Sequence, residues 1–499
     1  MPGQPTPATL AKQHRAKVWG EALAALTVLL AIIGMAVTSP PLVGPDESAH
    51  QATAYYTTVH LLPPKQEDLF YTPGILKQGN CTEFDSSKDA SCIPSREDVT
   101  PGKVRVLNYP PPYYWVVALG QKAAPTADTW SDVGGRAASM LLNIGALVLL
   151  ALLARRVTRN WGTYLLLVTT PMAAFLWAVV NPNGWEITTG LLFAVVFSTA
   201  WWNLDPWKDG RKSVWLRFVV VTGASLAFAL SRHDALVWMC LLVLAVLLMG
   251  RSALERTQKF RLLGAVLVGL VAALVWQFTH PPIHNLNNPD RVAEPVAMDY
   301  LHWLGQIDEM LPDRLRQMVG VLGALDTPVP YTLALLLMLG WAGLIGILFA
   351  RGRIPLLALV IGFVATILVP SLLEMSRWND WPYWYQGRIT LVFILPFLLL
   401  LLLRFGESSR RAAAALSMVT AAVLAFMVWQ NLMRYSFGIR DYIPVRWNDP
   451  AIGELWFWSG VSIVVAIVLT TVARVWLLML ERPQREIHSE PLIHDRYLL

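Results

Sequence analysis

An acidic pair stands shortly after the first apolar stretch of the chain. Asp46 and Glu47 follow Pro45, and His50 comes three residues after Glu47. Two earlier prolines hold the backbone extended, and Pro45 favours the start of a helix with Glu47 in its first turn. A carboxylate presented in this way can act as a general base toward a hydroxyl group. The alternative is a simple helix cap, which explains one acid better than two acids beside a histidine.

An aromatic segment lies further along the same polar stretch. Three prolines, residues 110–112, separate Tyr109 from Tyr113 and Tyr114. The prolines predict stiff, extended backbone, and the rings beside them form a flat amphipathic wall. Such a wall suits a sugar ring, and it equally suits an anchor at the membrane interface.

Ionisable residues also recur at the ends of apolar runs that are predicted to face the same side. Charges so near hydrocarbon are costly and usually mark a site or a cavity. Any one of them could simply end a helix, and Arg388 could extend toward the interface without binding anything. That five helix ends should all carry charge for this reason is less expected. Counted with the group of Asp46, Glu47 and His50, the five ends carry Glu186, then Arg232, His233 and Asp234, then Glu374, Arg377 and Asp380, and then Arg388.

The chain has three cysteines, and two of them share the first long polar segment. Cys81 and Cys92 are predicted to form a disulfide if that segment lies outside the cell, and two unpaired thiols are the alternative. Cys240 lies inside an apolar run and is expected to be a small core residue. No Cys/His spacing typical of a zinc site occurs.

The composition indicates that lipid is the solvent for much of the surface. Hydrophobic residues make up 55% of the 499 residues, charged residues 15%, and the mean hydropathy is +0.46. A water-soluble domain has about 25% charged residues. The net charge of +6 does not indicate nucleic acid, because Lys and Arg fall in short clusters between apolar runs.

Twelve apolar runs are long enough, or nearly so, to cross a bilayer. Lys and Arg cluster in the short segments between alternate runs, as expected of cytoplasmic loops. The pattern predicts an all-α integral membrane protein with about 12 transmembrane helices, both termini in the cytoplasm and long outer loops. The runs are residues 18–37, 135–154, 161–180, 186–203, 214–231, 235–250, 262–278, 330–350, 355–373, 389–404, 412–430 and 456–478.

The segment from Pro40 to His50 resembles the opening of a bacterial multi-pass membrane family, the domain-of-unknown-function family 2142. Further segments are similar to that family in the same order, through the tenth predicted helix. One departure is Ile389, where a tyrosine is expected. The similar segments are residues 109–114, Arg136, and residues 181–186, 323–328 and 386–388.

That family resembles the GT-C glycosyltransferases, and the resemblance implies a function. A GT-C-like enzyme of the bacterial plasma membrane would move a sugar from a polyprenyl-phosphate donor to an envelope glycan, lipid or protein on the outer face. Its expected partners are membrane lipid, the lipid-linked sugar and a glycan or glycolipid acceptor, and not nucleic acid. We expect the catalytic core over residues 1–404, with outer loops 38–134 and 279–329. C-terminal helices over 405–478, with outer loop 431–455, and a cytoplasmic tail over 479–499 complete the chain.

The expected reaction is an inverting displacement at the anomeric carbon. Asp46 is the predicted base, and Glu47 its partner, binding a sugar hydroxyl or a divalent cation, the one candidate cofactor. Arg388 is the first choice for the donor phosphate, helped by Arg377, Arg232 and His233. The remaining residues assigned to substrate binding are His50, Tyr109, Tyr113, Tyr114, Asn181, Asn183, Glu186, Asp326 and Gln386.

Two other functions remain open. A transporter or flippase for lipid-linked sugars needs ionisable residues at mid-bilayer depth, and the middle helices carry almost none; Arg217 is close to the inner end of its run. A non-catalytic envelope-assembly protein would leave the acidic pair without a role. Sequence names neither the sugar nor the acceptor.

Overall fold

The computed structural model describes residues 7–64, 68–73, 81–93, 99–104, 106–124, 127–204, 211–250, 252, 254–280, 300–352, 354–375, 386–446 and 449–480. Almost all of this chain is helical. The principal helices are α1 (Pro7–Thr38), α2 (Glu47–His60), α4 (Pro111–Ala123), α5 (Ala127–Val157), α6 (Trp161–Leu167), α7 (Pro171–Ala178), α8 (Pro182–Trp201), α9 (Arg211–Ala229), α10 (Ala235–Met249), α11 (Arg256–Thr279), α12 (Tyr300–Gly320), α13 (Tyr331–Ala350), α14 (Leu356–Phe363), α15 (Val369–Met375), α16 (Gly387–Phe405), α17 (Arg410–Phe437) and α18 (Glu454–Leu480).

Three antiparallel strand pairs complete the fold, and each is small. The strand β1 (Asp68–Pro73) pairs with β2 (Val99–Val104), β3 (Val321–Leu322) with β4 (Thr327–Pro328), and β5 (Ile439–Arg440) with β6 (Ile443–Pro444).

Seven helical segments of the described chain are long and apolar enough to cross a membrane, and the bent pair α6–α7 would be an eighth. The prediction of an all-helical, multi-pass membrane protein is confirmed. The number of spans is smaller than the predicted 12. The apolar parts of α9 and α10 are shorter than 18 residues, and α8 opens with a polar turn. The helices α16 and α17 follow one another through the short 3-10 turn Gly406–Ser409 and count together as one apolar segment of 51 residues, although its two ends contact Asp46 and Thr38 at the same end of the bundle.

The short helices α6 and α7 lie in the centre of the molecule. They meet at 90°, and the break falls at Thr170 and Pro171, where proline can begin a helix but not continue one. Every residue of α7 is buried. Because α7 is apolar on all sides, only a fully protein-lined position satisfies it.

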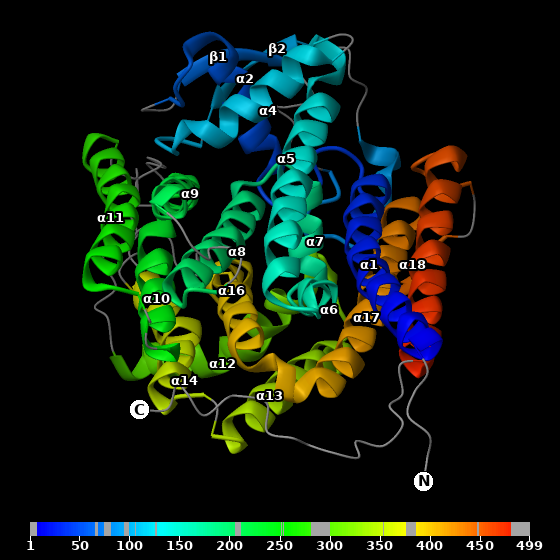
Figure 1. Ribbon diagram of the computed structural model, residues 1–499. Coiled ribbons are helices and arrows are strands. Elements are labelled where there is room, and N and C mark those ends of the chain that lie inside the picture. The colour runs from blue at the N-terminus through cyan, green and yellow to red at the C-terminus, as the bar shows by residue number, and fades with distance from the viewer. Residues whose placement is uncertain are drawn as a thin grey trace.

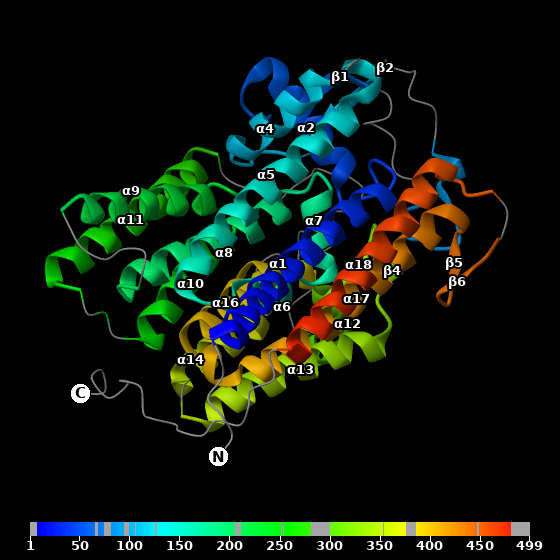
Figure 2. The same ribbon diagram turned by 45° about the vertical axis from the view of Figure 1, so that its right-hand side comes forward.

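The helices form a bundle with a smaller layer at one end. Figure 1 shows α2, α4 and the β1–β2 pair together at the top, beside the upper end of α5, against which α4 packs. On the right, α1 packs against α17 and α18, so the predicted C-terminal addition is joined closely to the first helix. The helix α8 packs against α16 near the middle of the molecule. The helix α9 packs on α11 at the left of Figure 2, on the side away from α18.

Candidate active site

The Asp46 turn links α1 to α2. Asp46 has a left-handed backbone (φ 55°), a conformation that residues other than glycine adopt only rarely. The Glu47 amide donates to the Gly44 carbonyl (3.0 Å) and the His50 amide to the Asp46 carbonyl (3.0 Å), so the helix begins at this turn. The Asp46 side chain makes no capping hydrogen bond and is 64% exposed. A helix cap therefore does not explain Asp46.

The neighbouring Glu47 carboxylate has the opposite environment. It is fully buried, and Arg136 of α5 binds both of its oxygens, at 2.9 and 2.5 Å. The amides of Gly44 and Val180 donate to the same two oxygens, at 3.0 and 3.1 Å. Glu47 thus ties together the Asp46 turn, α5 and the segment between α7 and α8. Its oxygens are already occupied, which leaves it poorly placed to bind a cation or a substrate.

Arg136 extends this clamp to the end of α1. Its terminal nitrogens also donate to the carbonyls of Ser39 and Pro40, at 2.6 and 2.9 Å. The two prolines after α1 keep those carbonyls out of helical hydrogen bonding, so that an arginine can bind them. The residues that position Asp46 therefore come from four separate parts of the chain.

Arg388 reaches Asp46 from the start of α16. Its Nη2 lies 3.0 Å from Oδ2 of Asp46, and its side chain is 7% exposed. No group in the described chain accepts a hydrogen bond from Nε or Nη1 of Arg388. A buried guanidinium with two open donors fits a bidentate anion such as phosphate.

Arg232 lies on the other side of this cluster, between α9 and α10. Its Nε is 3.2 Å from Oδ1 of Asp234 and 3.6 Å from Oε2 of Glu186, and all three side chains are largely buried. The Arg232 guanidinium also faces the Tyr109 ring at 5.7 Å. The predicted phosphate helper Arg232 is thus already shared between two carboxylates.

Aromatic rings connect Arg232 to the Asp46 turn. Tyr109 has its ring centroid 5.9 Å from His50 and 5.5 Å from His233. His50 Nδ1 lies 2.8 Å from the Tyr114 hydroxyl. Tyr113 instead points into the protein, where its hydroxyl lies 2.8 Å from Ser139 Oγ. Of the three tyrosines in the predicted wall, Tyr109 is partly accessible and lies beside His50, whereas Tyr113 and Tyr114 are fully buried and support it.

Electrostatics keep Asp46 ionised and His50 neutral. Enclosure by protein atoms alone would raise the pKa of Asp46, but Arg388, His50 and Arg232 outweigh this effect and lower it. Burial lowers the pKa of His50 to about 3; Asp46 opposes the shift, and the two arginines add to it. At neutral pH the exposed carboxylate is therefore the charged group, and the imidazole beside it is uncharged.

The amides predicted from sequence lie close to this cluster. Asn181 caps α8 by accepting from the Asn183 amide (2.9 Å), and its own Nδ2 donates to the Pro45 carbonyl (2.7 Å). Asn181 therefore holds the residue before Asp46. Gln386 stands directly before α16 and leaves its Oε1 without a hydrogen-bond partner in the described chain.

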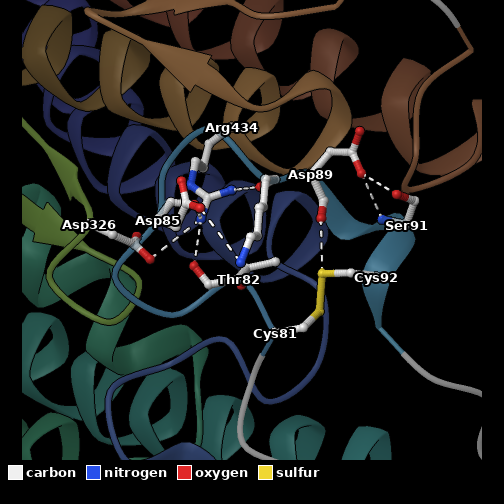
Figure 3. Close-up of a disulfide and its surroundings, with 9 residues drawn as sticks. Cys81, Thr82, Asp85, Asp89, Ser91, Cys92, Asp326 and Arg434 are labelled. Carbon is white, nitrogen blue, oxygen red and sulfur yellow. Dashed lines mark hydrogen bonds and ion pairs between the residues drawn. A yellow bond between two sulfur atoms is a disulfide. The ribbon is translucent and has the colours of Figure 1, made fainter.

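Asp326 belongs to a different cluster, shown in Figure 3. Its Oδ2 lies 3.4 Å from Nη2 of Arg434, a fully buried residue of α17. Arg434 also donates to the carbonyls of Thr82, Asp85 and Lys88. No contact in the described chain joins Asp326 to Asp46 or Arg388, so its surroundings do not suggest substrate binding.

Cys81 and Cys92 form a disulfide that closes the loop around Arg434 (Figure 3). Ala90 of this loop packs on Val43, three residues before Asp46, and on Tyr435. The loop thus supports the Asp46 turn from outside. The expectation that Cys240 is a core residue is wrong: it is not bonded and is exposed, because it lies on the outward-facing side of the apolar helix α10.

Two predictions, the role of Arg377 and the divalent cation, are not tested by the structure. Arg377 lies outside the described residues. Within the described part of the chain, no group of three or more His, Cys, Asp or Glu side chains could hold a metal ion. A divalent cation remains a candidate taken from the resemblance alone.

Sequence reasoning did not assign roles to Arg136, Asp234 or Arg434. Arg136 is one of the positions that resemble the family, and Arg434 lies in the predicted outer loop 431–455, but neither the resemblance nor the loop assigns either residue a partner. A signal did exist for Asp234, since it follows Arg232 and His233 at a helix end. For the other two, a lone arginine next to an apolar run gives no indication of which distant acid it meets.

The fold and this acid–arginine cluster define a multi-pass integral membrane protein with an accessible carboxylate beside a buried, partly unpaired arginine. The family described as "Predicted membrane protein (DUF2142)" matches residues 29–388. This chain belongs to that family.

Similar structures were also found. The apo crystal structure of ArnT from Cupriavidus metallidurans has a TM-score of 0.45 and 15% identity, covering 91% of this chain and 75% of that chain. The structure of ArnT bound to undecaprenyl phosphate has a TM-score of 0.40 and 15% identity, covering 91% and 77%. At these values the likeness by itself assigns neither an activity nor a substrate. No curated protein matches the sequence.

Proposed function

We propose that this protein is a membrane glycosyltransferase of the GT-C type, which moves a sugar from a polyprenyl-phosphate donor to a hydroxyl group of an envelope acceptor. The observation that carries the proposal is the contact between exposed Asp46 and buried Arg388 (3.0 Å), with two guanidinium nitrogens of Arg388 open. This contact supports a general base at Asp46 next to a phosphate-binding arginine. The donor class follows from the family resemblance.

In the proposed reaction, the acceptor hydroxyl oxygen forms a bond to the anomeric carbon of the sugar. The bond from that carbon to the phosphate oxygen breaks, and polyprenyl phosphate leaves with the electron pair. The hydroxyl proton passes to the Asp46 carboxylate. Because the leaving group is already a phosphate, a cation that holds its charge suffices, and Arg388 supplies it.

The donor phosphate also changes the state of Asp46. The guanidinium of Arg388 lowers the pKa of Asp46, which makes the carboxylate a weak base. A phosphate that binds Arg388 adds a negative charge nearby and competes for the guanidinium, so the pKa of Asp46 rises toward the range useful for proton uptake. In this proposal Glu47 is a positioning residue, because its hydrogen bonds fix the turn that carries Asp46.

We place the reaction on the outer face of a bacterial plasma membrane, with both termini in the cytoplasm. The Lys and Arg clusters favour this orientation. The Cys81–Cys92 disulfide gives independent support, since its loop packs beside the Asp46 turn and structural disulfides persist mainly in oxidising compartments.

The test is transfer by purified protein from polyprenyl phosphates that carry different sugars. Loss of a general base costs about 10²- to 10⁴-fold in rate, so Asp46→Asn should reduce transfer by this factor. Binding of polyprenyl phosphate and the thermal midpoint should change little, because Asn is isosteric and the side chain is exposed. Near-normal turnover by a well-folded Asp46→Asn variant would remove Asp46 as the base. Movement of the lipid-linked sugar across vesicles without transfer would favour a transporter instead.

A further inference from the structure

Two buried side chains near the site have hydrogen-bond acceptors that the protein does not use. Glu186 is fully buried, and neither of its carboxylate oxygens has a hydrogen-bond partner in the described chain. Asn183, one turn earlier on α8, is 2% exposed, and its Oδ1 is likewise unpaired among the described residues. Buried polar atoms are nearly always paired, so such a group calls for an explanation.

The cation next to Glu186 does not supply the missing hydrogen bonds. Nε of Arg232 is 3.6 Å from Oε2 of Glu186, beyond hydrogen-bond distance, and it is nearer to Asp234, at 3.2 Å. Arg232 therefore balances part of the charge and leaves the acceptor positions open. Glu47, which is equally buried, has four hydrogen bonds to its two oxygens. Burial alone thus does not prevent a glutamate in this protein from being fully paired.

The unpaired oxygens of Glu186 and Asn183 are linked to the Asp46 turn through neighbouring side chains. Glu186 contacts Arg232, whose guanidinium faces Tyr109 at 5.7 Å, and Tyr109 lies 5.9 Å from His50. On α8, Asn181 binds the carbonyl of Pro45. A second link runs through α16, because the Val392 carbonyl lies against Gly190 of α8. The two helices run in the same direction from their polar ends, which brings Glu186 to about the level of Arg388.

We propose that Glu186 and Asn183 bind hydroxyl groups of the sugar carried by the donor, with the Tyr109 ring as the side wall of this subsite. The proposal rests on the function proposed above and names the part of the donor that each end of the site recognises. Acceptor atoms without partners select a ligand that donates hydrogen bonds, which a sugar ring does and a second phosphate does not.

The two ends of the site have complementary chemistry. Arg388 offers only donors, two of them open, and the unpaired atoms of Glu186 and Asn183 in the described chain are carboxylate and amide oxygens. A glycosyl phosphate has the matching polarity, with an anion at one end and hydroxyl donors at the other. The acceptor substrate would have to approach the exposed side, where Asp46 is 64% accessible. Glu186 is therefore a specificity-determining residue for the transferred sugar.

Binding measurements separate this subsite from the phosphate site. The probes are polyprenyl phosphate alone and polyprenyl phosphates carrying glucose, mannose, galactose or arabinose. We expect the wild type to bind at least one sugar-bearing lipid more tightly than the bare lipid. Glu186→Gln should lose that advantage, on the order of 10- to 100-fold, as hydrogen bonds to a charged group imply. Its affinity for bare polyprenyl phosphate should stay within about threefold.

Thermal unfolding of the ligand-free protein gives a readout that needs no substrate. Glu186→Gln should leave the midpoint unchanged or raise it, because it replaces a buried carboxyl group whose oxygens have no hydrogen-bond partner in the described chain. The matched control, Glu47→Gln, replaces an equally buried but fully paired glutamate and should lower the midpoint by several degrees.

The outcomes distinguish the two proposals. If bare polyprenyl phosphate does not bind at all, the proposed function fails. If it binds, but no sugar adds affinity or Glu186→Gln binds every probe like the wild type, the sugar subsite is wrong and the phosphate site stands. A loss of stability in Glu186→Gln as large as in Glu47→Gln would make Glu186 a structural residue.

Discussion

Arg434 and Arg388, two buried arginines from the C-terminal half of the chain, each contact an acid. They differ in how many of their hydrogen-bond donors have a protein acceptor. Both terminal nitrogens of Arg434 have protein acceptors, and its acid, Asp326, is 3% exposed. Arg388 has one contact, to an acid that is 64% exposed, and two unpaired nitrogens. Within the described chain, Arg434 keeps only its Nε without an acceptor, whereas Arg388 keeps both Nε and Nη1. Arg434 is therefore held mainly by the protein, and Arg388 has a free edge that can bind an anion.

Arg434→Met should have the largest effect on stability. Removal of one partner of a buried ion pair costs about 3–5 kcal/mol, and here the carbonyls of the disulfide loop lose their donor as well. The measurement is thermal or denaturant unfolding of the purified protein. Arg440→Met, at an exposed position nearby, is the matched control and should have little effect. A stable Arg434→Met variant would remove the distinction between the two arginines.

Arg388→Ala should act on binding and not on folding. Loss of one partner of a buried charge-assisted contact costs about 2–5 kcal/mol, so affinity for polyprenyl phosphate should fall strongly. Stability should change little, because Asp46 is exposed and two donors of Arg388 are unpaired. Arg388→Lys should recover only part of the affinity, because the planar fork is lost. Unchanged affinity would move the phosphate site, with Arg232 as the next candidate.

The smallest expected effect is a loss of stability at low pH that is due to His50. Its pKa is about 3 in the folded protein and about 6.5 in the unfolded chain. Between these two pKa values the unfolded state binds more protons than the folded state. His50 therefore costs no stability above about pH 6.5, and the free energy of unfolding falls as the pH is lowered below that value. At pH 4.5 the loss amounts to about 3 kcal/mol.

The His50→Gln variant tests that effect, because glutamine can still bind the Tyr114 hydroxyl but does not titrate. Its thermal midpoint should fall less than that of the wild type between pH 7 and pH 4.5. Equal falls in the two proteins would show that His50 is not the group responsible.

The residues around Asp46 and Arg388 could be predicted from the sequence better than the buried ion pairs of Glu47 and Asp326. Asp46, Arg388 and the aromatic segment lie at ends of apolar runs, where polar residues are conspicuous, and the structure brings them together. Glu47 follows Asp46 directly and has the same chemistry, yet its environment depends on Arg136, 89 residues away. Asp326 depends in the same way on Arg434, 108 residues away. Pairing over such distances leaves no local pattern.

The number of spans shows a second limit. Apolar runs of similar composition form a long helix in α1, a pair of short helices bent by 90° in α6–α7, and two helices joined by one short 3-10 turn in α16–α17. Hydropathy records whether a residue avoids water. It does not separate a helix that faces lipid from one that is enclosed by other helices, such as α7.

A structure of the protein with bound polyprenyl phosphate tests the central claim most directly, since the claim is that Arg388 is open to an anion beside Asp46. We predict a phosphate oxygen within hydrogen-bond distance of Nε or Nη1 of Arg388, about 2.7–2.9 Å for a charge-assisted contact. The Asp46 carboxylate should face the phosphate without binding it, and the lipid chain should lie between helices. A phosphate bound elsewhere, with Arg388 still contacting Asp46 alone, would contradict the account.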